Sequence, residues 1–229
     1  MAHHTNKQEP IAELIGTFIL VFMGTAAVVT AKLAAGGAPF SFLHYLAIGT
    51  AFGVALMVAA YTVGPISGAH LNPAVTIGLA IGKRISMDKV VPYIAAQCAG
   101  GFLASLVLLA LLGTKAYGLG ETTVGVLGLR EALGAEVALT AILVFTVLGV
   151  TDKGAPAGFA GLIIGIYLAA SHLIGVPLSG NSLNPARSLG PALLVGGPAL
   201  QQMFLVYTVA PIAGGIVGAL KYRWLKGGK

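Results

Sequence analysis

Long apolar stretches separated by short polar segments dominate this chain of 229 residues. Six of them reach the roughly 20 residues that a helix needs to cross a bilayer. Two shorter apolar segments, at about 73–82 and 185–195, are too short to cross and are typical of re-entrant half-helices that line a cavity. The pattern predicts an all-α membrane protein with six transmembrane helices and two re-entrant half-helices. The expected spans are approximately 11–35, 42–64, 90–112, 131–150, 157–177 and 200–220.

The composition agrees with a membrane protein. Hydrophobic residues make up 57% of the chain and charged residues 9%, whereas a soluble domain has about a quarter charged residues. The formal net charge is +6, but the basic residues lie in short loops between apolar spans, so we expect no nucleic-acid partner. The single cysteine, Cys98, excludes an internal disulfide and a cysteine metal cluster. We expect no metal and no cofactor.

The distribution of Lys and Arg indicates an orientation. If the N-terminus is cytoplasmic, only Lys32, Lys115 and Arg130 face out, and Arg187 lies within the membrane. The positive-inside rule therefore predicts a multi-pass protein of the cell membrane (plasma or inner membrane), with both termini cytoplasmic. The basic residues on the cytoplasmic side would be Lys7, Lys83, Arg84, Lys89, Lys153, Lys221, Arg223, Lys226 and Lys229.

The chain also repeats itself. The stretch AELIGTFILVF at 12–22 resembles AEVALTAILVF at 135–145, and SGAHLNPAV at 67–75 resembles SGNSLNPAR at 179–187. Each half would contain three spans, so the halves enter the membrane in opposite orientations, which is typical of transport proteins with sites near the midplane. We expect a single channel domain over residues 1–229. Its inverted-repeat halves would cover about 10–112 and 130–222, with a linker at 113–129.

The two Asn-Pro-Ala triplets are expected to form the central constriction. Asparagine is a good N-cap and proline suits the first helical turn, so each triplet predicts the start of a half-helix. The inverted repeat would bring these two positive helix ends together, which makes a barrier for cations. The asparagine amides would donate to the oxygen of a passing water and interrupt the hydrogen-bond chain that protons need. The constriction would consist of Asn72, Pro73, Ala74, Asn184, Pro185 and Ala186.

With these motifs in hand, the chain resembles the water-selective aquaporins of the major intrinsic protein family. The resemblance covers nearly the whole chain and rests on AELIGTF, SGAHLNPAVT, GAEVALT and SGNSLNPARS. It implies six spanning helices and two half-helices, assembled as a homotetramer with one pore per subunit. Water would be the permeant and the lipid bilayer the surrounding partner.

The resemblance also implies a selectivity filter. Arg187 would line the narrow outer opening, joined by Phe52 from the second span, His172 from the fifth and the backbone carbonyl of Asn181. Water-selective members have histidine in the fifth span, and glycerol channels usually have aspartate after the filter arginine, where this chain has Ser188. An intramembrane arginine is costly unless it faces a wet pore, which fits a filter role.

Three further polar residues have two possible interpretations each. Glu13 and Glu136 stand at matching places in the first and fourth spans. The resemblance implies that they accept hydrogen bonds from the re-entrant loops, although intramembrane carboxylates also serve as proton relays. His70 would line or brace the cytoplasmic vestibule, although a histidine there could also sense pH.

These observations predict a passive, osmotically driven water channel that excludes protons and ions. The alternative is a broader channel for small neutral solutes: glycerol, ammonia, hydrogen peroxide or carbon dioxide. A scaffold of the same fold with little conduction stays open. An intramembrane hydrolase that uses Ser67, Ser179, His70 and His172 is disfavoured, because the serines belong to the repeated loop motif and no nucleophile-elbow or metal motif occurs. We therefore do not expect an enzyme.

Overall fold

The computed structural model describes residues 8–227, and within them all regular structure is helical. His3 and His4, to which we assign no function, lie outside the described residues, as do Lys7 and Lys229 of the charge count. The long helices are α1 (Gln8–Ala35), α2 (Phe42–Ser67), α4 (Met87–Leu112), α5 (Leu129–Val150), α6 (Ala160–Ser179) and α9 (Ala210–Leu225). The short ones are α3 (Pro73–Ile81), η1 (Gly118–Gly120), α7 (Pro185–Val195), α8 (Gly197–Met203) and the π-helical turn η2 (Leu205–Val209).

Among the described residues, six helical segments are long and apolar enough to cross a membrane. The sixth combines η2 and α9, from Leu205 to Leu225. The two short apolar segments of the sequence form α3 and α7, each shorter than a bilayer crossing requires. The predicted fold class, six transmembrane helices with two re-entrant half-helices, is thus confirmed.

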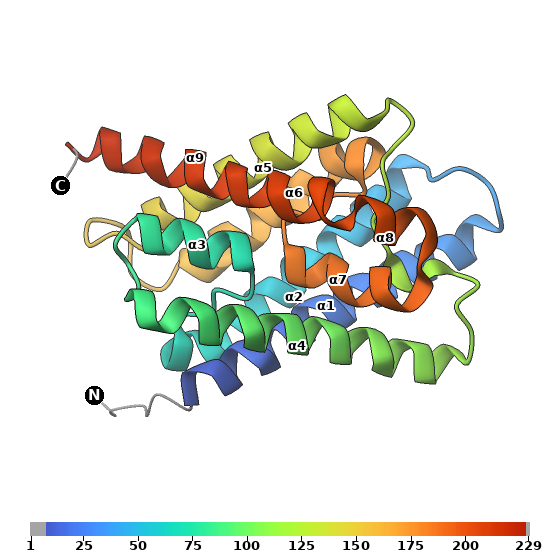
Figure 1. The fold of residues 1–229 in the computed structure, drawn as a ribbon, viewed down its shortest axis with the longest axis horizontal. Helices are drawn as coiled ribbons and strands as arrows, with labels where there is room; N and C mark the ends of the chain where they lie inside the picture. Colours follow the sequence, from blue (N-terminus) through green and yellow to red (C-terminus); the bar gives the residue numbers. More distant parts are fainter. Residues whose placement is uncertain (1–7, 228–229) are drawn as a thin grey trace.

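The long helices surround the two short ones. Helix α1 packs against α2 and α4, α5 packs against α6 and α9, and α2 packs against α6. Figure 1 shows α3 and α7 between α9 and α4, with α1 beginning and α9 ending at the same end of the bundle. The half-helices are therefore enclosed by protein, which permits the irregular backbone that precedes each of them.

Helices α2 and α6 both stop just before this irregular backbone. Each ends at a serine followed by a glycine in the left-handed conformation, Gly68 with φ 88° and Gly180 with φ 74°. Glycine adopts this conformation without steric cost and is the usual residue just after a helix. The repeated Ser-Gly pair thus places the two loops at equivalent positions in the two halves.

The last span differs from its expected start near residue 200. A separate helix, α8, occupies that region, and the π-helical turn η2 precedes α9. Within this turn, the amide of Val209 donates to the carbonyl of Phe204 at 2.9 Å. Pro211 has no N–H, so the carbonyl of Tyr207 cannot receive its regular helical hydrogen bond. The apolar pattern alone did not predict this interruption.

Candidate functional site

The first loop turns sharply before α3. Ala69 and Leu71 both have left-handed backbone, with φ 50° and 57°. The helix then begins at Pro73, and the side-chain oxygen of Asn72 accepts a hydrogen bond from the amide of Ala74 at 2.8 Å. Asn72 is thus the N-cap that the triplet predicted.

The second loop has the same shape. Asn181 and Leu183 are left-handed, with φ 51° and 53°, and α7 begins at Pro185. The side-chain oxygen of Asn184 accepts from the amides of Ala186 at 3.0 Å and Arg187 at 3.3 Å.

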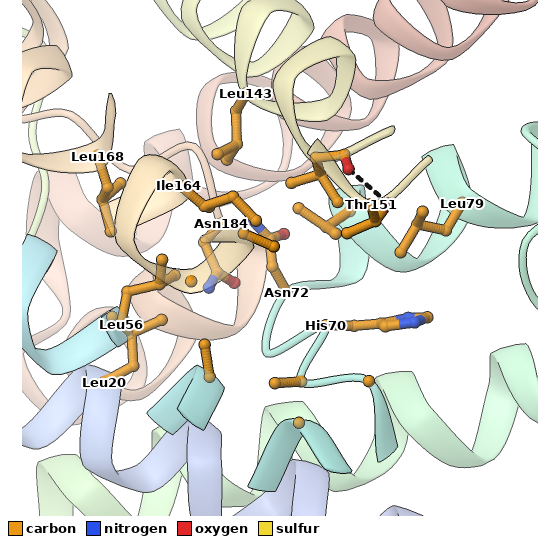
Figure 2. Close-up of a pocket in the computed structure, with 18 of the residues that line it drawn as sticks. Leu20, Leu56, His70, Asn72, Leu79, Leu143, Thr151, Ile164, Leu168 and Asn184 are labelled. Carbon is orange, nitrogen blue, oxygen red and sulfur yellow. Dashed lines mark hydrogen bonds between the residues drawn. The ribbon is translucent and has the colours of Figure 1, made fainter. Parts of the chain in front are cut away.

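The two asparagines connect the halves directly. The amide nitrogen of Asn72 donates to the carbonyl of Leu183 at 2.7 Å, and that of Asn184 donates to the carbonyl of Leu71 at 2.8 Å. Figure 2 shows the two asparagines beside one another in a wall that is otherwise largely apolar. Each amide carries two hydrogens, so each keeps one N–H beyond this bond for a molecule in the cavity.

Glu13 and Glu136 support the two loops. Glu13 is fully buried in α1 and accepts hydrogen bonds from the amides of His70 at 2.9 Å and Leu71 at 2.7 Å, and from the Ser67 hydroxyl at 2.7 Å. These contacts join α1 to the first loop, and the role of loop support that the sequence resemblance implied stays a prediction.

Glu136 makes the matching contacts in the other half. It is fully buried in α5 and accepts from the amides of Ser182 at 2.8 Å and Leu183 at 2.7 Å, and from the Ser179 hydroxyl at 2.7 Å. Ser67 and Ser179 therefore donate to carboxylates, and within residues 8–227 neither is hydrogen-bonded to a histidine, as a hydrolase that used them would require.

Three supporting residues were missed from the sequence. Gln97 in α4 is fully buried and donates to Glu13 at 2.7 Å. The hydroxyls of Tyr93 and Tyr207 donate to the carbonyls of the two serines that end α2 and α6, at 2.9 and 2.8 Å. A glutamine inside an apolar span was the available signal for Gln97, because buried polar side chains need partners.

Two cavities approach each other inside the bundle. The larger, of about 480 Å³, runs from Arg84 and Thr151 past the two asparagines to Phe52, His172 and Arg187. The smaller, of about 310 Å³, is lined by Lys32 and Glu121 among others and also reaches Arg187. Arg187 lines both cavities, so the boundary between them lies at this side chain.

Phe52, His172 and Arg187 meet at this boundary. The rings of Phe52 and His172 stack with centroids 4.5 Å apart, and Cζ of Arg187 lies 4.9 Å from the Phe52 ring centroid. A terminal nitrogen of Arg187 donates to the carbonyl of Gly120 in η1 at 2.7 Å. Three of the four predicted filter residues therefore lie together at the boundary between the two cavities.

Only some of the polar atoms of His172 and Arg187 form hydrogen bonds within the protein. Nδ1 of His172 bonds the Leu168 carbonyl at 2.7 Å; a carbonyl only accepts, so Nδ1 carries the hydrogen. Nε2 of His172 and Nε of Arg187 are buried and have no protein partner among the described residues. A neutral His172 would thus offer one acceptor beside the donors of Arg187.

The fourth predicted filter residue is placed differently from the other three. Asn181 is fully buried, and its side chain is directed to α6, where its amide nitrogen donates to the Ser171 hydroxyl at 3.1 Å. It is absent from the lining of both cavities, although its neighbour Gly180 lines the smaller and Ser182 the larger. A role for its backbone carbonyl stays a prediction.

His70 lines the larger cavity, and its place in a cytoplasmic vestibule stays a prediction. Its Nδ1 lies 3.2 Å from the Thr76 hydroxyl, and its ring packs edge-on against Tyr93 at 5.1 Å. Among residues 8–227, no three His, Cys, Asp or Glu side chains gather where they could hold a metal ion.

Comparisons with known proteins show the family of this chain. The sequence profile of the family described as Major intrinsic protein matches residues 1–222. This chain belongs to that family. Its membership indicates a membrane channel or transporter rather than an enzyme.

Several relatives carry one name. The chain is 40% identical to Aquaporin Z of Rhodopseudomonas palustris, over 97% of this chain and 94% of that protein. It is 42% identical to Aquaporin Z of Photorhabdus laumondii, over 93% of this chain and 95% of the relative. The aquaglyceroporin structure from Plasmodium falciparum superposes with a TM-score of 0.81 at 24% identity, covering 96% of this chain and 95% of that one. This last likeness concerns the fold.

Proposed function

We propose that this protein is a passive water channel, driven by osmotic gradients, that excludes protons and ions. The observation that carries the proposal is the pair of asparagine amides at the starts of two half-helices, side by side on a cavity that reaches Arg187. The similarity to proteins named Aquaporin Z supports it independently.

The paired asparagines would orient each water. The free N–H of Asn72 and that of Asn184 would both donate to one water oxygen, so its hydrogens point along the pore in both directions. A one-directional chain of hydrogen bonds, which proton hopping requires, is interrupted there. The positive ends of α3 and α7 face the same place and raise the energy of a cation.

Phe52, His172, Asn181 and Arg187 would form the selectivity filter. A water molecule that enters the filter loses hydrogen bonds to other waters. It can replace them with bonds to Nε of Arg187 and Nε2 of His172, which have no protein partner among the described residues. Phe52 would form the apolar part of the filter wall, because its ring stacks on His172 and lies beside Arg187. A polyol would need a wider opening with an apolar wall, and a cation would meet the charge of Arg187.

Stopped-flow light scattering on proteoliposomes tests this function. Proteoliposomes with the wild-type protein should shrink fast in a sucrose gradient and should not reswell fast in glycerol. His172→Gly removes the imidazole ring from the wall of the filter, so proteoliposomes with this variant should admit glycerol. His44→Gly is the control, since His44 in the first turn of α2 lines neither cavity. Fast glycerol entry in wild type would favour the alternative, a channel for glycerol, ammonia, hydrogen peroxide or carbon dioxide.

The proposal includes an orientation in the cell membrane. The excess of Lys and Arg supports the placement of both termini in the cytoplasm. The end where α1 begins and α9 ends also carries Lys89, Arg84 and Lys226 in ion pairs. A reporter fused after residue 229 should be active only in its cytoplasmic form, and activity of a periplasmic reporter would contradict the orientation.

The proposal also includes a homotetramer, which rests on the family resemblance. Light scattering of the detergent-solubilised protein, corrected for detergent, should give about four times the 23.1 kDa of one chain. A mass of one chain would contradict it.

A further inference from the structure

The side chain of Asn181 is held by one face of α6. Its amide nitrogen donates to the hydroxyl of Ser171 at 3.1 Å, and its backbone amide donates to the hydroxyl of Ser179 at 3.2 Å. Between these two serines stands Gly175, where an added Cβ would overlap the Asn181 carboxamide. The helix face at 171, 175 and 179 thus forms a recess that fits this side chain.

The same turn of α6 carries His172. The Ser171 hydroxyl donates to the carbonyl of Leu168 at 2.8 Å, and Nδ1 of His172 bonds the same carbonyl at 2.7 Å. The Leu168 carbonyl is also the regular helical acceptor of the His172 backbone amide, so it is a shared acceptor in this turn. A continuous hydrogen-bonded chain therefore leads from Asn181 through Ser171 and Leu168 to the ring of His172.

The loop on the other side of Asn181 forms cavity wall. Gly180 lines the smaller cavity and Ser182 the larger, on either side of Arg187. Movement of the Asn181 backbone would therefore change the width of the passage at Arg187. The bond to Ser171 fixes this backbone relative to the helix turn that presents His172.

Packing and backbone preference explain only part of this arrangement. Asparagine tolerates left-handed backbone better than most residues, which suits the φ of 51° at Asn181. Backbone preference does not require a serine opposite the carboxamide. The side-chain oxygen of Asn181 is buried without a partner among the described residues, which is unfavourable for stability. A purely structural residue at this position would more simply be glycine.

We propose that Ser171 and the Asn181 carboxamide are positioning residues that set the width of the selectivity filter through their mutual hydrogen bond. The proposal rests on the filter of the proposed function and names two groups that act behind it. Loss of the bond would let the 180–182 segment move away from His172 and admit a larger neutral solute such as glycerol.

The test measures the ratio of glycerol to water permeability in proteoliposomes. Ser171→Ala should raise this ratio by about fivefold, the change in equilibrium expected on losing one intramolecular hydrogen bond. Asn181→Gly removes the carboxamide and suits the left-handed backbone, so it should raise the ratio similarly. The double variant should show no further increase, because both changes break the same bond.

The control is Ser105→Ala, which removes another fully buried serine hydroxyl, bonded to the Gly101 carbonyl at 3.1 Å. It should leave the ratio at the wild-type value, because Ser105 lines neither cavity. An unchanged ratio in Ser171→Ala, or effects that multiply in the double variant, would overturn the proposal.

A structural measurement keeps this test separate from the proposed function. Wild type that conducts no water, or that passes glycerol freely, contradicts the proposed function itself. In either case an experimental structure of Ser171→Ala still decides the positioning role. The Asn181 side chain should leave α6 and its backbone should shift, and an unmoved 180–182 segment would overturn the inference.

Discussion

Two leucines in the re-entrant loops have a strained backbone conformation that hydrogen bonds stabilise. Leu71 and Leu183 are left-handed, a conformation that costs a residue with a Cβ about 1–2 kcal/mol. Their amides donate to the buried carboxylates of Glu13 and Glu136, and their carbonyls accept from the opposite asparagines. Charge-assisted hydrogen bonds are among the stronger ones, so they offset the strain.

Asp152 predicts a pH-dependent contribution to stability. Its carboxylate accepts from Lys226 at 2.8 Å and from the Tyr222 hydroxyl, and lies 3.5 Å from Arg84. The hydrogen bond from Lys226, followed by those from Tyr222 and the Lys153 amide, lowers the pKa of Asp152 below its usual range. A lowered carboxylate pKa stabilises the fold above the unfolded pKa of about 3.9 and loses this effect as pH falls.

Asp152→Asn should therefore lower the thermal unfolding temperature at pH 7, and the difference should shrink below about pH 4. Fluorescence-detected thermal unfolding of the purified protein across pH measures it. Asp88→Asn is the matched control, because Asp88 in the first turn of α4 belongs to no ion pair found within residues 8–227. Equal effects of the two variants at pH 7 would contradict the assigned contacts.

The sequence predicted the positions of some residues in the fold better than it predicted their hydrogen-bond partners. The triplet chemistry placed Asn72 and Asn184 at helix starts, and the structure has them there. It did not predict that each would bond a leucine carbonyl of the other half, since left-handed leucine is an unusual conformation. The direction of the Asn181 side chain depends on Gly175 and Ser171, which the motif does not include.

At the scale of helices, close contact depends on particular glycines. Gly101 in α4 faces α7, and a Cβ there would overlap the carbonyl oxygen of Ala186. Small residues at helix interfaces let backbones approach in membranes. The position of α7, and with it Arg187, therefore depends on the missing side chain at residue 101.

Gly101→Ala should lower the thermal unfolding temperature by roughly 2–10 °C, because overpacking a buried contact costs about 1–3 kcal/mol. The displaced α7 should also slow water permeation in proteoliposomes.

Gly134→Ala is its control. Gly134 lies within α5, where an added Cβ would meet no atom within 4 Å, and alanine is the better helix former. This variant should keep or slightly raise the unfolding temperature. Equal destabilisation by the two substitutions would show that backbone contact at Gly101 is not the cause.

Helix identity was predicted more accurately than helix ends. Length and hydropathy sufficed for the spans because the bilayer demands long apolar helices. The pattern missed η1, α8 and the π-helical turn before Pro211. These elements depend on single glycines and prolines and on packing against distant segments. Hydropathy averaged over a window of residues detects neither.

At the scale of the whole molecule, two half-helices from opposite halves meet beside the larger cavity, while Arg187 divides this cavity from the smaller one. The repeated motifs predicted that the triplets would come together. They did not predict the close stacking of Phe52 on His172, which depends on the packing of α2 against α6. Gly49 and Gly53 of α2 lie at this contact, close to Ala169 and the carbonyl of Gly165.

The central claim is a pore that passes water and stops protons. The most direct measurement records both fluxes in one preparation of proteoliposomes, with light scattering after an osmotic step and an internal pH dye after a pH step with valinomycin present. The account predicts shrinkage much faster than in empty liposomes and a pH relaxation equal to theirs. Water flow no faster than in empty liposomes, or a pH relaxation that accelerates with protein content, would contradict it.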